Sequence, residues 1–221
     1  MCDSDPYWSA VRATRLRIAD LLEELAPAEW EHESLCRGWR VRDVAGHLAL
    51  IPTITTWDMV AVAWRARFSP DRINTVLARR YGSRDPGDLI AAIRTHVDTR
   101  RTAKVLDTRN ALFDAIVHGQ DIALPLARQF PVPAEHSREA LRRVWAMGWP
   151  FHAERRLAGL SLRATDSDWA VGDGPEVRGP SLSLLLLLTG RTACLDTLHG
   201  DGVDRLKSSH ATRRDIRSRG G

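Results

Sequence analysis

The chain has 221 residues, which is enough for one large domain or two small ones with a real core. Apolar residues make up 43% and charged residues 27%, as in soluble globular proteins, and the longest apolar run, residues 182–188, is far shorter than the ~20 residues of a membrane span. The net charge is +4, but the basic residues are scattered among acidic ones and no recognition motif accompanies them, so we expect neither nucleic acid nor membrane as a partner.

The cysteines and the N-terminal residues indicate the cellular compartment. The three cysteines are odd in number and lie at the widely separated positions Cys2, Cys36 and Cys194. The first ten residues lack the basic stretch followed by an apolar stretch that marks a secretory signal. We therefore expect a cytoplasmic protein with reduced thiols.

The first part of the chain has the apolar spacing of helices. That spacing predicts helices over residues 7–27, 53–68, 88–105, 109–124 and 134–149, and another that begins near Val41. Asp43 lies in the first turn of the helix from Val41, where the helix dipole favours a carboxylate, and Pro52 should kink or break that helix. Residues 69–87 are interpreted as a connection, and Asp88 as the cap of the helix that follows.

The pattern changes after the last of these helices. Residues 160–180 contain short alternating segments separated by Asp, Gly and Pro, which predict strands and turns. Residues 181–191 predict one buried helix that begins near Ser181 and ends near Gly190. We expect a mainly α protein with a helical bundle over residues 1–155, a small α/β domain over 156–207 and a flexible basic tail over 208–221.

Two polar side chains interrupt the apolar helix predicted over residues 109–124. Asp114 and His118 are four residues apart, so they share one helix face and can hold one metal ion together. His47 is the best candidate for a third ligand, because apolar residues on both sides place it on the inward face of its own helix. Three nitrogen and oxygen ligands leave a fourth position open, as in a catalytic zinc site.

Each of these residues also has a purely structural interpretation. Asp114 and His118 could form a hydrogen-bonded polar pair at the edge of the core. Asp43 and Asp121 could cap or end their helices, or each could orient a ligating histidine through its far ring nitrogen. Cys36 is interpreted as a small buried residue without a chemical role.

Residues 25–49, LAPAEWEHESLCRGWRVRDVAGHLA, resemble the opening of the mycothiol-dependent maleylpyruvate isomerase family, which lies within the DinB-like superfamily of metal-binding helical bundles. In that family a Trp-x-Val-x-Asp segment leads into a helix whose histidine binds metal, and Trp39, Val41, Asp43 and His47 match it. The family's second signature is an acidic residue, three residues, histidine, two residues and aspartate. Asp114, His118 and Asp121 match this signature, although its first residue is more often Glu.

The C-terminal part carries a further likeness. Residues 168–191 and the HGDG segment at 199–202 resemble the family's small C-terminal domain. The arginine of its Thr-Gly-Arg segment is implicated in the isomerase chemistry, and Arg191 aligns with it. The alternative is that Arg191 caps the carbonyl groups at a helix end.

The resemblance implies a DinB-like four-helix-bundle domain that binds a divalent metal, with zinc as the expected ion, followed by the small α/β domain. It also implies an enzyme that uses mycothiol, the low-molecular-weight thiol of actinobacteria, for S-transfer to a small electrophile or for its cis–trans isomerisation. In that interpretation His47, Asp114 and His118 hold the metal, Asp43 and Asp121 support the ligands, and Arg191 is catalytic. The expected partners are a small-molecule thiol and an electrophilic substrate, and the protein is expected to be a monomer or a homodimer. The alternative function is a metal- or thiol-binding stress-response module without turnover.

Overall fold

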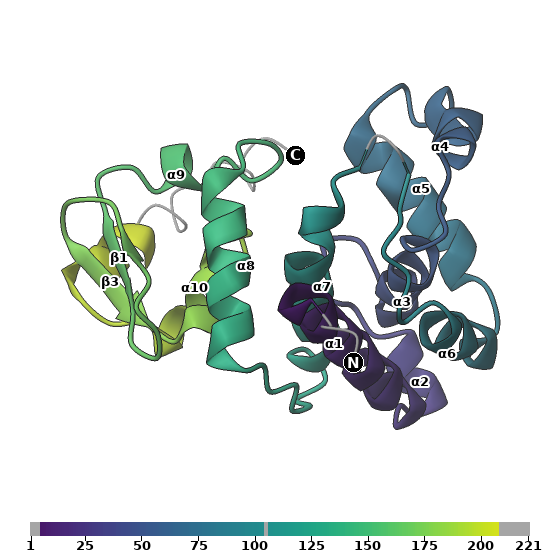
Figure 1. Ribbon diagram of the computed structural model, residues 1–221, viewed down its shortest axis with the longest axis horizontal. Helices are drawn as coiled ribbons and strands as arrows, with labels where there is room; N and C mark the ends of the chain where they lie inside the picture. The colour runs from purple at the N-terminus through teal and green to yellow at the C-terminus, as the bar shows by residue number, and fades with distance from the viewer. Residues whose placement is uncertain (1–4, 104–105, 208–221) are drawn as a thin grey trace, which may run out of the picture. The chain divides into compact units, whose positions relative to one another are not determined.

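The computed structural model describes residues 5–103 and 106–207, and the predicted tail over 208–221 lies outside the described residues. The chain forms two compact units with their boundary between Pro131 and Val132. The expected fold class is confirmed, because a set of helices is followed by a smaller part that contains a three-stranded sheet (Figure 1). No helix within the described ranges is long and apolar enough to cross a membrane.

The first unit consists of helices. Its elements are α1 (Pro6–Glu23), α2 (Pro27–Trp30), α3 (Val41–Leu50), α4 (Thr56–Ala63), α5 (Pro70–Gly82), α6 (Pro86–Thr95), the 3-10 turn η1 (Thr108–Asn110) and α7 (Ala111–Ala123). Helix α1 packs against α6 and α7, and α3 packs against α5, α6 and α7. The two helices that the sequence singled out, α3 and α7, therefore contact each other in the core of this unit.

Helix α3 begins where the sequence predicts. Arg40 has an extended backbone before the first turn, and its N–H donates to Oδ2 of Asp43 at 3.0 Å, so the carboxylate closes the start of the helix. The helix ends at Leu50, two residues before Pro52. Nine of its ten residues are buried, and Asp43 and His47 are the polar ones among them.

Three expectations for residues 69–105 are wrong. Residues 69–87 are not a plain connection, because most of them form α5, which begins with Pro70 at its first turn. The cap of α6 is Asp85, whose carboxylate accepts from the N–H of Gly87, and Asp88 lies inside the first turn instead. Helix α6 also ends at Thr95, well before residue 105.

The second unit packs one helix between another helix and a sheet. Its elements are α8 (Ala134–Ala146), α9 (Ala153–Arg156), β1 (Ser161–Ala164), β2 (Ala170–Val171), β3 (Glu176–Gly179), α10 (Ser181–Leu188) and the 3-10 turn η2 (Leu195–Thr197). Strand β1 is central, antiparallel to β2 and parallel to β3. Helix α10 contacts α8 as well as β1 and β3, which explains its run of buried leucines (Figure 1).

The boundary of the compact units differs from the domain boundary expected at residue 155. Helix α8 packs against α10, so it belongs with the second unit although its sequence continues the helical pattern of the first. Residues 160–180 and 181–191 form the strands and the buried helix that their sequence predicts.

Candidate metal centre

The three predicted metal ligands lie together in the first unit. His47 projects from α3, and Asp114 and His118 project from α7 one turn apart. Nε2 of His47 lies 3.4 Å from Oδ2 of Asp114, and Nε2 of His118 lies 3.5 Å from Oδ1 of the same carboxylate. One ligand atom from each of the three residues lies within 4.8 Å of the other two.

These spacings leave room for a metal ion between the three side chains. Ligand bonds of ~2.0–2.1 Å at the tetrahedral angle place two ligand atoms about 3.3–3.4 Å apart. The two distances to Asp114, 3.4 and 3.5 Å, run to different oxygens of the carboxylate, and both are longer than a good hydrogen bond. Two imidazole nitrogens and a carboxylate oxygen are also the donor set of a zinc site with an open fourth position.

His47 supports the same interpretation through an unsatisfied atom. The side chain is 4% exposed, and its buried Nε2 has no hydrogen-bond partner among the described residues. Its other ring nitrogen, Nδ1, lies 3.0 Å from Oδ1 of Asn74 on α5. If Nδ1 carries the proton and donates it to this amide oxygen, Nε2 keeps its lone pair for a metal.

His118 is also held through its second ring nitrogen. Its Nδ1 lies 2.9 Å from Oδ2 of Asp121, a carboxylate with 0% exposure. A carboxylate that accepts from the far nitrogen of a histidine orients the ring and makes it a better ligand. Of the two interpretations given for Asp121, the geometry therefore favours support of a ligating histidine over a surface charge at a helix end.

The electrostatics keep the Asp114 carboxylate charged. Burial raises the pKa of Asp114, but the imidazoles of His47 and His118 lower it more and Arg15 adds to their effect, so that the pKa falls to about 2. Arg15 is itself buried on α1, where Nη1 donates to the carbonyl oxygens of Val97 and Thr99. Asp114 is therefore an anionic ligand at neutral pH.

Asp114 also faces a small cavity. The cavity has a volume of about 10 Å³, and Arg15 and Leu48 line it together with the carboxylate. This volume holds roughly one water molecule. The space beside the anionic ligand is therefore small.

Trp39 covers both histidines from one side. Its ring stacks on His118 with a centroid distance of 6.2 Å and an interplanar angle of 12°, and it lies 5.7 Å from the ring of His47. The indole is 8% exposed, and its N–H donates to Oγ1 of Thr75 at 3.3 Å. This apolar wall limits the ways in which the two imidazoles can move and keeps water from that side.

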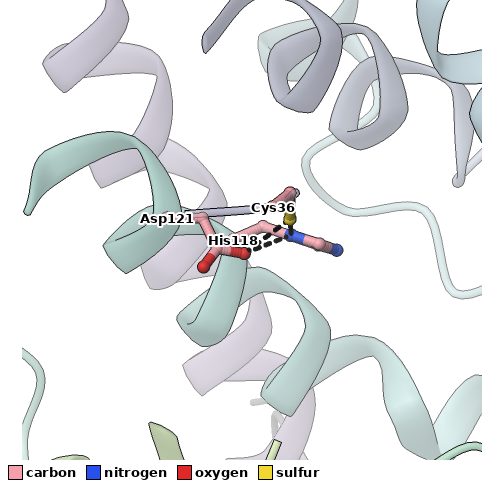
Figure 2. Close-up of side chains that lie close together, drawn as sticks. All are labelled: Cys36, His118 and Asp121. Carbon is pink, nitrogen blue, oxygen red and sulfur yellow. Dashed lines mark hydrogen bonds and ion pairs between the residues drawn. The ribbon is translucent and has the colours of Figure 1, made fainter. Parts of the chain in front are cut away.

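Cys36 is closer to the site than its interpretation as a small buried residue predicts. Figure 2 shows the thiol beside His118 and Asp121, with Sγ 3.0 Å from Oδ2 of Asp121 and 3.5 Å from Nδ1 of His118. The Sγ–Oδ2 and Nδ1–Oδ2 distances, 3.0 and 2.9 Å, are those of hydrogen bonds and are shorter than the edges of a metal tetrahedron. Cys36 therefore contacts Nδ1 of His118 and the supporting carboxylate of Asp121, on the side of the ring away from Nε2.

The other two predicted site residues are not part of this cluster. Asp43 contacts the backbone and the guanidinium of Arg40, so the structure favours its interpretation as a helix cap. Arg191 lies in the second unit just after α10, where Nη1 donates to the carbonyl oxygen of Thr189 at 2.9 Å. This contact is the expected alternative for Arg191 as a residue at a helix end.

Two supporting residues, Asn74 and Cys36, were missed from the sequence. Asn74 lies in the segment that was interpreted as a connection, although Ser69 and Pro70 before it are a typical helix start. Cys36 is far from Asp121 in the sequence, and no local spacing links the two.

Comparison with known proteins gives the family of the N-terminal part. The model of the mycothiol maleylpyruvate isomerase N-terminal domain matches residues 11–104. Residues 11–104 belong to that family. The matched range includes His47, Trp39, Cys36 and Asn74, whereas Asp114 and His118 lie beyond it. A comparison of the sequence with curated proteins found no match.

Two solved structures share the fold over most of the chain. One is a crystal structure of the mycothiol-dependent maleylpyruvate isomerase, with a TM-score of 0.61 and 16% identity over 89% of this chain and 92% of that one. The other is a variant of the mycothiol-dependent maleylpyruvate isomerase with one histidine replaced by alanine, with a TM-score of 0.62 and 15% identity over the same shares. At these identities the likeness concerns the fold, and a coverage of 89% means that it reaches into the second unit.

Proposed function

We propose that this protein is a metal-dependent enzyme that uses mycothiol to isomerise a small electrophile or to transfer sulfur to it. The observation that carries the proposal is the set of His47, Asp114 and His118, which bring one ligand atom each within 4.8 Å of one another and include a buried imidazole nitrogen that makes no hydrogen bond. The family of residues 11–104 supports mycothiol as the thiol. Zinc is the proposed ion because the donors are two imidazoles and one carboxylate.

The metal and each residue of the site would have a separate role in this reaction. A bound zinc ion supplies Lewis acidity, which lowers the pKa of a thiol from roughly 8.5 and makes the thiolate abundant at neutral pH. Asp114 contributes the negative charge of the ligand set. Asn74 and Asp121 hold the two imidazoles with their Nε2 atoms toward the ion, and Trp39 excludes water from one side.

The chemistry proposed for the thiolate is nucleophilic addition. In an isomerisation, the thiolate adds to an activated cis double bond, the resulting single bond rotates, and expulsion of the thiolate restores the double bond as trans. In an S-transfer, the carbon–sulfur bond remains, and either a leaving group departs with its electron pair or the carbanion formed by addition takes up a proton. Arg191 carries a permanent charge and a planar fork of donors, and we propose that it binds a carboxylate of the substrate or of the thiol.

A mycothiol-dependent assay of the metal-loaded protein tests this function. The electrophiles should include maleylpyruvate, and glutathione serves as the alternative thiol. We expect turnover with mycothiol in preference to glutathione, and its loss in His118→Ala and after chelation. If the protein binds mycothiol but converts none of the electrophiles, it is a thiol-binding module rather than an enzyme.

The role of Arg191 has its own comparison. Arg191→Lys keeps the charge but loses the bidentate fork, so we expect lower activity with unchanged metal content. Full activity of Arg191→Lys would contradict a role in substrate binding, and the role of Arg191 would then be its contact with Thr189 at the end of α10.

A further inference from the structure

The turn before α3 is attached to α7 at the residue that supports His118. The N–H of Leu35 donates to the backbone carbonyl of Asp121 at 3.1 Å, and the thiol of Cys36 donates to Oδ2 of its side chain at 3.0 Å. Two successive residues of the turn therefore hold both the backbone and the carboxylate of one α7 residue. Figure 2 shows Cys36 reaching the helix beside His118.

The turn itself is well fixed. Oγ of Ser34 accepts from the N–H of Cys36 at 3.1 Å and donates to the carbonyl oxygen of Trp39 at 2.9 Å. The N–H of Trp39 in turn donates to the carbonyl oxygen of Cys36 at 2.9 Å. The position of the thiol is therefore set by the same hydrogen bonds that place Trp39 against the two histidines.

Two donors converge on one oxygen of Asp121. Oδ2 lies 3.0 Å from Sγ of Cys36 and 2.9 Å from Nδ1 of His118. Because Asp121 is fully buried, water cannot replace either donor, and each hydrogen bond restricts the rotation of the carboxylate. A carboxylate that is fixed in this way also fixes which nitrogen of His118 carries the proton.

We propose that Cys36 is a positioning residue of the metal centre, whose thiol holds the Asp121 carboxylate so that His118 keeps its proton on Nδ1 and directs Nε2 to the metal. This inference rests on the proposed function for the metal itself. It gives the cysteine no part in thiol chemistry and no place among the ligands. It predicts that the site requires a hydrogen-bond donor at residue 36 and that this donor need not be a sulfur atom.

Variants at Cys36 separate the donor from the sulfur. Cys36→Ala removes the donor, Cys36→Ser keeps one, and Cys194→Ala is the matched control because Cys194 lies in the second unit and donates to the carbonyl oxygen of Ser183. Zinc affinity is measured by competition with a chromogenic chelator. We expect Cys36→Ala to bind zinc about 10-fold more weakly, at the low end of the effect of losing the direct partner of a ligand, because Cys36 acts through Asp121. Cys36→Ser should recover most of that loss, and Cys194→Ala should bind as the unchanged protein does.

Equal affinity in Cys36→Ala, or a loss in Cys36→Ser as large as in Cys36→Ala, would overturn the positioning role. If Cys36→Ala does not fold, Cys36→Val replaces it, because valine fills the space of the thiol without a donor. Cobalt loading provides a further check. A sulfur-to-cobalt charge-transfer absorption that disappears in Cys36→Ala would identify Cys36 as a ligand and would also overturn the proposal.

The ring proton of His118 tests the inference without any metal. In the metal-free protein, nitrogen-15 NMR of the imidazoles should show the Nδ1–H tautomer of His118 in the unchanged protein and in Cys36→Ser, and a mixture of tautomers in Cys36→Ala. An unchanged tautomer in Cys36→Ala would contradict the role of Cys36. If the unchanged protein binds no zinc but the tautomers behave as expected, the proposed function fails, while the effect of Cys36 on the ring proton of His118 stands.

Discussion

At the scale of single residues, the candidate centre depends on one nitrogen of each histidine. Asn74 and Asp121 occupy the Nδ1 atoms of His47 and His118, which leaves both Nε2 atoms beside Asp114. The sequence identified the three ligands because Asp114 and His118 have helical spacing and His47 lies among apolar neighbours. It did not identify Asn74 or Cys36, because their roles come from contacts between segments far apart in the chain.

A variant of Asn74, which is not itself a proposed ligand, tests whether its contact with Nδ1 orients His47. Asn74→Ala removes the acceptor of the Nδ1 proton of His47, so the ring can turn or change its tautomer. We expect zinc affinity to fall by about 10- to 100-fold with little change in fold. His199→Ala, at an exposed position in the second unit, is the control. An affinity equal to that of the control would show that the Asn74 contact does not orient His47.

The thiol of Cys194 should behave as a buried residue. Burial raises its pKa to about 11, so the thiol stays protonated at neutral pH in the folded protein. The thiolate is the reactive species, and its fraction rises as the pH approaches that pKa. We expect iodoacetamide to label Cys194 only after unfolding, which peptide mass spectrometry with and without denaturant can measure. Rapid labelling of the native protein at neutral pH would contradict this burial.

At the scale of elements, the centre depends on the contact between α3 and α5. Helix α3 was predictable because its apolar residues and the following Pro52 define it locally. Helix α5 was not recognised, since only Leu77, Ala78 and Gly82 of its thirteen residues are buried and charged residues surround them. What makes α5 part of the site is its packing against α3, which is a tertiary property.

Gly46 and Gly82 allow these two helices to approach closely. A Cβ at Gly46 would clash with the backbone nitrogen of Gly82 and would lie 2.7 Å from the carbonyl oxygen of Ala78. We expect Gly46→Ala to destabilise the fold by about 1–3 kcal/mol through overpacking, and to weaken zinc binding because α5 carries Asn74. Urea unfolding and chelator competition measure the two effects.

Gly148→Ala is the matched control for Gly46→Ala, because the nearest atom to its added Cβ, Nδ1 of His152, would lie 3.9 Å away. We expect this variant to keep both its stability and its zinc affinity. If Gly46→Ala resembled it in both measurements, the close approach of α3 and α5 would not be needed for the site.

At the scale of the whole molecule, the candidate functional residues belong to two compact units. His47, Asp114 and His118 lie in the first unit, and Arg191 lies in the second. The sequence predicted both the helical part and the small sheet, because periodicity and turn residues are local properties. It assigned α8 to the bundle, since an amphipathic helix does not reveal in its own sequence which unit it packs against.

X-ray absorption at the zinc edge of the loaded protein tests the central claim most directly. The ligand set of two histidines and one aspartate predicts only nitrogen and oxygen neighbours at ~2.0–2.2 Å before thiol is added. After mycothiol is added, we expect one sulfur neighbour at ~2.3 Å, because the thiol takes the open position. Sulfur in the spectrum before the thiol is added, or a spectrum that mycothiol leaves unchanged, would contradict the account.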